Sequence, residues 1–214
     1  MNWRTAIPEF RRDGLYIVGE CVVAHNEAAA QAALADALTG PNVQRLLEIG
    51  YGLGLAHRRV RRDPPVEHWV VEGNEELAGA CRAGTTGKPA ARIMCDTWES
   101  VLDSAPPGYF DAVLFDPYPF DDEARRLEGW FPKFRFVSER AADLVVAALA
   151  EDGLLGFLNF DPDRCNVSVA EWLFGGSLAF KSVVRLEESE PEIWVMRKQI
   201  QAKDPESLKA IART

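Results

Sequence analysis

The chain has 214 residues, of which 47% are hydrophobic, and a formal net charge of −9 at pH 7. This length and apolar content predict one domain, residues 1–214, with a sizeable core. The negative charge argues against a nucleic-acid partner, because nucleic-acid phosphates would be repelled.

Residues 1–23 mix charged with scattered apolar side chains, and we expect them to form an N-terminal cap or lid rather than part of a regular sheet. The Ala-rich stretch from Ala24 to Leu38 predicts a helix that stops at Gly40-Pro41. Strand and helix patterns then alternate. We expect strands near residues 44–48, 68–72, 91–95, 111–116, 154–159, 179–185 and 192–198, and helices near 54–62, 74–83, 97–103, 134–150 and 166–174.

This alternation favours an α/β fold, with a doubly wound, mostly parallel seven-stranded sheet covered by helices on both faces. Gly153 is expected to close the helix that precedes the strand at 154–159. The last two strands have no helix pattern between them, which predicts an antiparallel hairpin at one edge of the sheet. Residues 201–214 form a polar tail.

Three alternating glycines, Gly50, Gly52 and Gly54, follow an apolar run that ends in Glu48. This order predicts a buried strand opening into a tight turn, where backbone without a Cβ lets a nucleotide-like ligand approach. Glu72 ends the next apolar run, at about the 20-residue spacing at which an acid meets ribose hydroxyls in nucleotide-binding βαβ units. Taken alone, each feature is equally compatible with an ordinary tight turn or a solvated strand end.

Asp96 and Asp116 end two further predicted strands, so four acids would gather where the parallel strands end. Trp98 could cover an adenine ring there, or could equally be a core residue. The prolines in Asp116-Pro117-Tyr118-Pro119 stiffen the loop that follows. Either this loop presents Asp116 to a substrate, or Asp116 accepts hydrogen bonds from neighbouring backbone N–H groups in a turn.

Four scattered cysteines and three histidines show no metal-ligand spacing, so we expect reduced thiols and no metal site. There is no N-terminal hydrophobic signal segment and no apolar run near the roughly 18 residues of a membrane span, so we expect a cytoplasmic protein without a membrane partner. The basic run Arg58–Arg62 fits a solvated helix end better than a nucleic-acid site.

Several segments, taken together, resemble one enzyme family. They are Gly50–Gly54, Glu67–Asn74, Trp98–Glu99 and Tyr109–Pro119. The chain is similar through them to guanidinoacetate N-methyltransferases and, more distantly, to fungal protein-arginine N-methyltransferases. The similarity runs from about Leu15 to about Asn159. It implies a Rossmann-like class I methyltransferase fold that uses S-adenosyl-L-methionine (SAM) as methyl donor.

The resemblance also implies two groups of site residues. The SAM-binding group would comprise Glu48, Gly50, Tyr51, Gly52, Gly54, Leu55, Glu72, Gly73, Asn74, Trp98 and Glu99. Glu27 and Asp116 align with the two carboxylates that hold the acceptor guanidino group, and are expected to be the catalytic residues. Without the resemblance, Glu27 would be interpreted as an acid in the first turn of a helix.

Guanidino methylation gives these two acids a chemical role. A guanidinium keeps its proton in water, with a pKa above about 12, and its delocalised lone pair is a poor nucleophile. Two carboxylates match its planar N–H fork, localise positive charge on the nitrogens that are not methylated, and take up the released proton. This chemistry requires no metal.

One segment departs from the family pattern and bears on the substrate. After the fifth strand of the sheet the chain reads Asn159-Phe160-Asp161-Pro162-Asp163. Acids there disfavour a substrate with a bare carboxylate and favour an amino group, such as the α-ammonium of free L-arginine against Asp161. Tyr118, Asn159 and Trp3 complete the expected substrate-binding set, with Tyr16 as an alternative to Trp3.

We therefore expect a SAM-dependent methyltransferase that acts on a guanidino nitrogen of L-arginine or a related small molecule in a biosynthetic pathway. The alternatives are guanidinoacetate or protein arginine as acceptor, and a SAM-binding partner subunit without turnover. A homodimer is compatible with the sequence.

Overall fold

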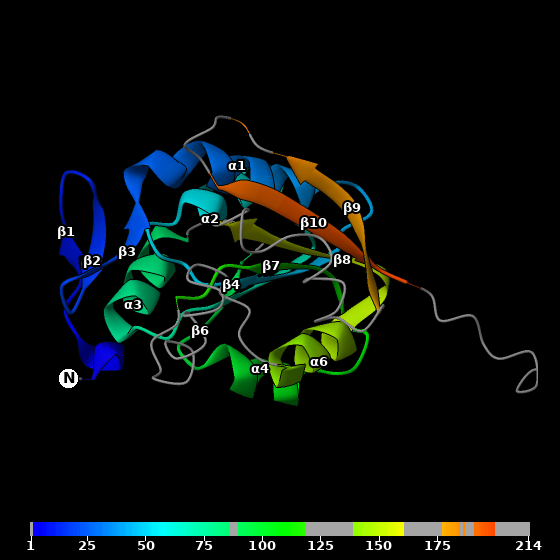
Figure 1. Cartoon of the computed structure of the whole chain (residues 1–214). Coiled ribbons are helices and arrows are strands. Elements are labelled where there is room, and N and C mark those ends of the chain that lie inside the picture. Colours follow the sequence, from blue (N-terminus) through cyan, green and yellow to red (C-terminus); the bar gives the residue numbers. More distant parts are fainter. Residues whose placement is uncertain are drawn as a thin grey trace, which may run out of the picture.

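The computed structural model describes residues 2–85, 90–118, 139–160, 177–184, 186 and 191–199. Seven strands form one sheet in the order β6-β5-β4-β7-β8-β10-β9 (Figure 1). They are β4 (Arg45–Ile49), β5 (Glu67–Val71), β6 (Arg92–Met94), β7 (Phe110–Phe115), β8 (Leu149–Asn159), β9 (Leu178–Val184) and β10 (Glu192–Lys198). β10 pairs antiparallel with β8 and β9, and the other neighbours pair parallel. The predicted mostly parallel sheet with an antiparallel edge hairpin is confirmed.

Helices cover both faces of this sheet. They are α1 (Ala28–Ala37), α2 (Leu55–Val60), α3 (Glu75–Gly84), α4 (Trp98–Ser104) and α6 (Glu139–Ala148), with 3-10 turns η1 (Trp3–Thr5) and η2 (His25–Glu27). α1 and α2 lie on one face, whereas α4 and α6 lie on the other (Figure 1). The helix expected near 166–174 and the tail 201–214 fall outside the described residues. Within the described part of the chain, no helix has the length and apolarity that crossing a membrane would require.

The two faces bury separate hydrophobic clusters, because successive strand residues point in opposite directions. Leu46 of β4 packs in the cluster that contains Leu34 of α1. The next residue, Leu47, packs in the cluster that contains Val101 of α4 and Val145 of α6. Each of these side chains is at most 5% exposed, so each contributes about 1.5–3 kcal/mol through burial.

Local signals fix where several helices begin. The Asn74 side chain accepts hydrogen bonds from the N–H groups of Glu76 and Leu77 at the start of α3, and Thr97 caps α4 in the same way. The basic run Arg58–Arg62 ends α2, as expected, and Arg59 pairs there with Asp36 of α1.

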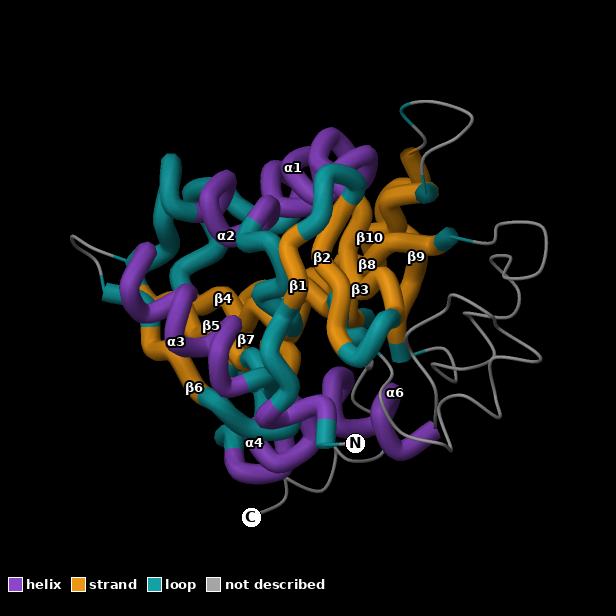
Figure 2. The backbone as a smooth tube through the Cα atoms, turned by 90° about the vertical axis from the view of Figure 1, so that its left-hand side faces the viewer, coloured by secondary structure: helices purple, strands orange, loops and turns teal. Residues whose placement is uncertain are grey.

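The N-terminal segment differs from the sequence-based expectation. Residues 9–24 form a three-stranded antiparallel sheet of β1 (Glu9–Phe10), β2 (Gly14–Ile17) and β3 (Glu20–Ala24). This small sheet stands in front of the larger one when the molecule is viewed from its N-terminal side (Figure 2). The expectation that residues 1–23 lie outside any regular sheet is therefore wrong.

Two short signals in β2 and its turn explain this small sheet. Leu15 and Ile17 are fully buried on either side of the half-exposed Tyr16, which is the alternation of a strand with one buried face. Val18 and Gly19 both have positive φ, 54° and 82°, as in the two-residue turns that favour hairpins. This alternation is hard to recognise in the sequence, because it covers few residues and charged residues surround it.

Gly153 also differs from its predicted position. α6 ends at Ala148, and the next residue, Leu149, already pairs with Phe110 of β7. Gly153 lies in an irregular stretch of β8, between Leu149 and the point where regular pairing resumes at Leu154. Strand pairing thus ends the helix before the glycine signal is reached, because tertiary contacts override a local cap preference.

A pair of glycine substitutions tests the packing of α1 on β8. A Cβ at Gly156 would lie 2.6 Å from Leu38 Cδ1 and 2.7 Å from Leu34 Cδ1, both buried. We expect Gly156→Ala to lower the free energy of unfolding by about 1–3 kcal/mol through overpacking. Gly79→Ala is the matched control: no heavy atom lies within 4 Å of its Cβ position in α3, so it should be stabilising by about 0.5–1 kcal/mol. Urea denaturation measures both, and equal effects would contradict the packing described here.

Candidate active site

The carboxyl end of β4 is where the strand order reverses, because β5 and β7 pair with β4 on opposite sides. The Gly50 N–H donates to the Val71 carbonyl at 2.9 Å, and the Asp116 N–H donates to the Ile49 carbonyl at 2.9 Å. The Asp116 carbonyl comes so close to Gly50 that a Cβ would collide with it. The predicted glycine turn therefore lies directly against the loop that carries Asp116, at the place where ligands bind in open α/β sheets.

All three glycines of the turn adopt a left-handed backbone. The φ values of Gly50, Gly52 and Gly54 are 88°, 50° and 65°. Other residues adopt this region at a cost, so the turn depends on glycine. Gly54 also occupies the N-cap position of α2, whose first N–H groups therefore face the turn.

Glu72, at the end of β5, holds the turn in place through its carboxylate. One oxygen accepts from the N–H groups of Tyr51 and Gly52 at 2.9 and 3.3 Å, and the other accepts from the Asn74 N–H at 2.8 Å. Burial raises the pKa of Glu72, while the backbone donors oppose that rise. Glu72, the acid predicted to contact the ribose, is 7% exposed and lies beside the turn that it orders.

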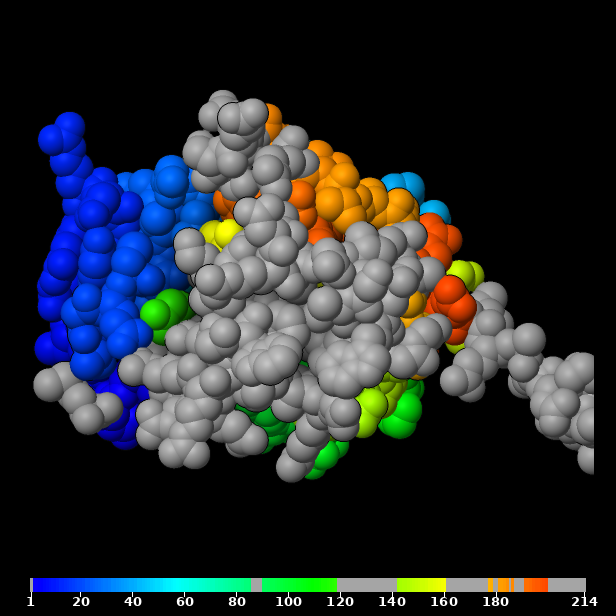
Figure 3. Space-filling model, in the orientation of Figure 1, coloured from blue at the N-terminus to red at the C-terminus, as the bar shows by residue number. Residues whose placement is uncertain are grey.

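The N-terminal segment covers this edge of the sheet and forms one end of the molecule (Figure 3). The Trp3 ring lies so close to Gly73 that a Cβ would collide with it, and Val23 Cγ2 lies 2.7 Å from the Cβ position of Gly52. Trp3 is thus placed beside Glu72, on the expected cofactor side of the site. Tyr16 instead donates to Asp13 at 2.8 Å within the small sheet.

Asn74 has a structural role that the sequence did not indicate. Its oxygen caps α3, and its nitrogen donates to the carbonyls of Trp3 and Ala6 at 2.8 and 2.9 Å. The side chain is fully buried and presents no surface to a ligand. The cofactor contact expected for Asn74 stays a prediction, and the structure shows that its side chain fastens the N-terminal segment to α3.

Trp98 and Glu99 begin α4, just beyond the end of β6. The Trp98 ring is half-buried and meets Phe115 edge-on, with ring centroids 5.0 Å apart. Trp98 therefore supports the core and also has an exposed part at the edge of the sheet. Asp96 accepts from the Thr97 N–H at 2.8 Å, the local turn role that strand-end acids often have.

Glu27 and Asp116 are both 8% exposed, although they are acids far apart in sequence. Glu27 accepts from the Ala24 N–H at 2.9 Å, at the junction of η2 and α1. Gln31, one helical turn further on, donates from Nε2 to Asp116 Oδ2 at 2.5 Å. Glu27 itself lies in η2, directly before the first residue of α1 and four residues before Gln31.

Gln31, which is 4% exposed, was not among the site residues predicted from the sequence. The available signal was weak: a polar residue amid the alanines of α1, four residues after Glu27. Such a position usually faces solvent. Only the three-dimensional structure shows that Gln31 meets Asp116, the acid that follows β7.

Of the other residues predicted to bind the substrate, the structure describes Tyr118 and Asn159. The Tyr118 hydroxyl donates to Glu20 Oε2 at 2.9 Å, which ties the Asp116 loop to β3. Asn159 is fully buried at the end of β8, and its Nδ2 donates to Glu192 Oε2 at 3.5 Å. Asp161 lies outside the described residues. Leu55, expected near the cofactor, is half-buried in the first turn of α2.

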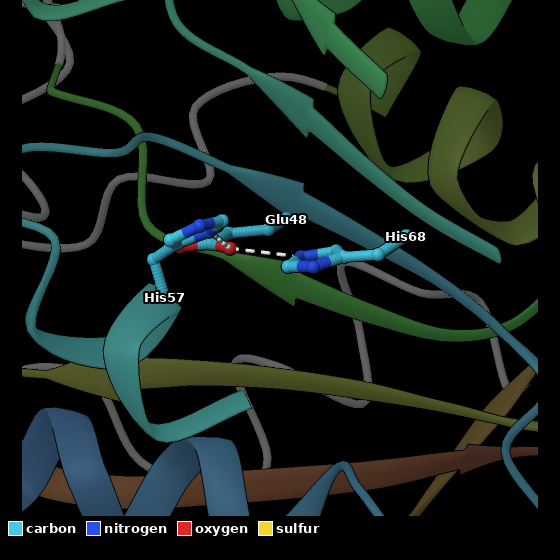
Figure 4. A group of neighbouring side chains, drawn as sticks. All are labelled: Glu48, His57 and His68. Atoms are coloured by element: carbon cyan, nitrogen blue, oxygen red, sulfur yellow. Dashed lines mark hydrogen bonds and ion pairs between the residues drawn. The ribbon is translucent and has the colours of Figure 1, made fainter. Parts of the chain in front are cut away.

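Glu48 points into the protein and lies between two histidines (Figure 4). Its Oε2 is 2.9 Å from His57 Nδ1 and 2.9 Å from His68 Nε2, and none of the three residues is more than 4% exposed. Glu48 is itself fully buried and offers no surface to a ligand. The SAM contact expected for Glu48 stays a prediction, and the structure shows that its side chain joins β4 to α2 and β5 beneath the glycine turn.

The hydrogen bonds of this cluster extend to Thr85. Thr85 Oγ1 donates to the Cys81 carbonyl at 2.7 Å, so it accepts from His57 Nε2 at 3.0 Å. The ligand atoms of Glu48, His57 and His68 lie within 4.8 Å of one another, a grouping that sequence spacing does not reveal. We interpret it as a hydrogen-bonded cluster that satisfies polar groups buried in the core.

Comparison with known proteins agrees with this geometry. The family model of guanidinoacetate N-methyltransferase matches residues 1–162 of the chain. Protein arginine N-methyltransferase 2 of Aspergillus fumigatus is 27% identical over 118 residues, which are 54% of this chain and 25% of that protein. The chain therefore matches only about a quarter of the length of that curated relative.

Solved structures show the same fold at low sequence identity. A spermidine synthase bound to a transition-state analogue has a TM-score of 0.61 at 17% identity, covering 92% of this chain and 71% of that chain. The N-methyltransferase NodS from Bradyrhizobium japonicum has a TM-score of 0.55 at 16% identity, covering 82% and 96%. The expected class I methyltransferase fold is confirmed.

The buried cluster gives a stability prediction. His57→Leu removes one partner of Glu48, and we expect a loss of about 3–5 kcal/mol in the free energy of unfolding at pH 7. His25→Leu is the matched control, because His25 is exposed and should change stability by at most about 0.5 kcal/mol.

The loss of unfolding free energy in His57→Leu should be smaller at acid pH than at neutral pH. Despite burial, hydrogen bonds from His57 and His68 hold the pKa of Glu48 below its ordinary value. Its stabilisation is therefore present above the unfolded pKa of about 4.3 and is lost as the pH falls through the folded pKa. Chemical denaturation from pH 7 to pH 3.5 should show the difference between wild type and His57→Leu narrowing at acid pH. A difference that is constant over this range would contradict the hydrogen-bonded cluster.

Proposed function

The chain belongs to the guanidinoacetate N-methyltransferase family, and we propose that it transfers a methyl group from SAM to a guanidino nitrogen of a small molecule, most favourably free L-arginine. The observation that carries this proposal is a pair of buried acids: Asp116 lies against Gly50 of the glycine turn and contacts Gln31 of α1, and Glu27 directly precedes that helix. A family of SAM-dependent N-methyltransferases supplies the reaction type.

The SAM site that we propose lies along the carboxyl ends of β4, β5 and β6. The left-handed turn Gly50–Gly54 would approach the methionine part, because its backbone carries no Cβ atoms at the glycines. Glu72 would accept hydrogen bonds from the ribose hydroxyls. Trp98 and Glu99, at the start of α4, are placed for the adenine, with Trp3 covering the same edge from Gly73.

The acceptor would bind between Glu27 and Asp116. Their carboxylates can hold the planar N–H fork of a guanidinium and concentrate its positive charge away from the reacting nitrogen. The lone pair of that nitrogen forms the new N–C bond, and the electrons of the broken C–S bond return to sulfur. The nitrogen then releases a proton, for which a neighbouring carboxylate is the acceptor. Both reactants are cations, so buried negative charge favours bringing them together.

The preference for arginine is part of this proposal, and acids near the end of β8 support it. Glu192 lies opposite Asn159 in the β8–β10 pair, and its carboxylate accepts from the Asn159 amide. The sequence places Asp161 just beyond. Acids at this position suit an amino group and repel a carboxylate, which favours arginine over guanidinoacetate as the acceptor.

Protein arginine is the second candidate acceptor, because the curated relative from Aspergillus fumigatus is a protein arginine N-methyltransferase. A SAM-binding subunit without turnover is disfavoured, because binding SAM alone gives no reason for these two buried acids. Both alternatives predict outcomes that differ from those expected for a small-molecule enzyme.

Replacing the acceptor acid separates catalysis from cofactor binding. In Asp116→Asn we expect the SAM dissociation constant to stay within about threefold, and kcat to fall by at least about 100-fold, because a neutral amide neither localises guanidinium charge nor accepts the proton. Calorimetry and a labelled-SAM assay measure the two quantities. Asp36→Asn, on the solvent side of α1, is the control and should keep wild-type kcat. Undiminished turnover in Asp116→Asn would remove the assigned role.

The acceptor preference is tested by a direct competition. L-Arginine and guanidinoacetate are supplied together with labelled SAM, and methylated products are separated by mass spectrometry. We expect kcat/KM for arginine to exceed that for guanidinoacetate by at least about tenfold, the equivalent of one favourable charge contact. A preference for guanidinoacetate would contradict the proposed recognition of an amino group, and methylation of peptidyl arginine alone would favour the second candidate.

A further inference from the structure

Gln31 is the residue of this site that family resemblance does not assign a role. It lies in α1, is 4% exposed, and its Nε2 is 2.5 Å from Asp116 Oδ2. The contact joins residues 85 positions apart, so it is a tertiary contact rather than a consequence of helix geometry. A buried polar side chain that reaches an acid at the reaction centre is a candidate for positioning that acid.

The chemistry of the pair fixes which way the amide faces. An ionised carboxylate only accepts hydrogen bonds, so the Gln31 NH₂ group, not its carbonyl oxygen, must face Asp116. The amide is neutral and leaves the negative charge of Asp116 in place. It engages Oδ2 and thereby restricts rotation of the carboxylate about its terminal torsion, which is otherwise broad.

Such restriction matters because a guanidinium presents its N–H groups in one plane. A carboxylate accepts two of them only when its own plane is aligned with the guanidinium fork. The Asp116 N–H donates to the Ile49 carbonyl of β4, which holds the backbone of Asp116 in place. Strand pairing does not fix the orientation of the Asp116 side chain. Gln31 supplies a fixed donor there from α1, four residues after Glu27.

We propose that Gln31 is a positioning residue that orients Asp116 for the acceptor, so that α1 supplies the group that aligns this acid. This inference rests on the proposed function. It adds that the amide is needed for efficient methyl transfer although it need not touch SAM.

Two substitutions test the donor directly. Gln31→Met keeps the length of the side chain without the donor, and we expect kcat to fall about 10- to 100-fold at every pH, with the SAM dissociation constant within about twofold. Gln31→Glu places a second carboxylate against Asp116. When protonated it donates as the amide does, and when ionised it repels Asp116, so activity relative to wild type should fall by at least about tenfold as the pH rises from 6 to 9. A residue that only fills space would not produce this pH dependence.

The control is Gln44→Met, because Gln44 is an exposed glutamine at the opposite end of β4 and bonds only Pro41 through its side chain among the described contacts. It should keep wild-type kcat. Wild-type kcat in Gln31→Met, or a Gln31→Glu profile that parallels the wild type, would overturn the inference while leaving the methyltransferase assignment intact.

Crystal structures distinguish failure of the positioning role of Gln31 from failure of the proposed function. Crystal structures of wild type and Gln31→Met should show the Asp116 carboxylate rotated or disordered in the variant. An unchanged carboxylate would overturn the positioning role whatever the substrate is. Failure of the wild type to methylate any guanidino compound would instead contradict the proposed function.

Discussion

The contact between Gly50 and the backbone of Asp116 is the constraint on which the site depends. It occurs where the strand order reverses, and it leaves no room for a Cβ at Gly50. The turn expected to receive SAM and the loop expected to receive the acceptor are therefore held side by side by strand pairing. Methyl transfer needs nitrogen, methyl carbon and sulfur in line, and most of that alignment is a matter of fixed geometry. Under the proposed function, the fold would supply such geometry before either substrate binds, and the buried acids would supply the charge that two cationic reactants need.

Most of the fold was predictable because its strands are long enough to show their pattern. The order of apolar runs and helix patterns predicts the central parallel strands, and the absence of a helix before β10 predicts the antiparallel edge. The small N-terminal sheet was not predicted, since Leu15 and Ile17 give only two buried positions and the turn uses Val18 in a backbone region that this residue type rarely adopts. Gly153 was wrongly predicted to close the helix, because a cap signal is local, whereas the end of α6 is set by pairing with β7.

The positions of the expected site residues along the chain were predictable, and the side-chain directions that the sequence did not indicate have a common cause. Sequence placed Glu48 and Asn74 at the edge correctly, but the direction of a side chain depends on partners from other elements. Glu48 turns inward because His57 and His68 approach it from α2 and β5. Gln31 was missed for the converse reason: nothing in an alanine-rich helix indicates that a glutamine meets an acid 85 residues away. Strand-end acids are thus easy to find from sequence, while the groups that orient them are visible only in three dimensions.

The most direct test is a crystal structure of the protein with S-adenosylhomocysteine and L-arginine. The account predicts that the guanidinium lies between the carboxylates of Glu27 and Asp116, with one of its nitrogens facing the sulfur across the gap that a methyl group would fill. It also predicts that the α-ammonium points toward the end of β8. A guanidinium bound elsewhere, or either carboxylate turned away from it, would contradict the central claim that these two acids hold the methyl acceptor.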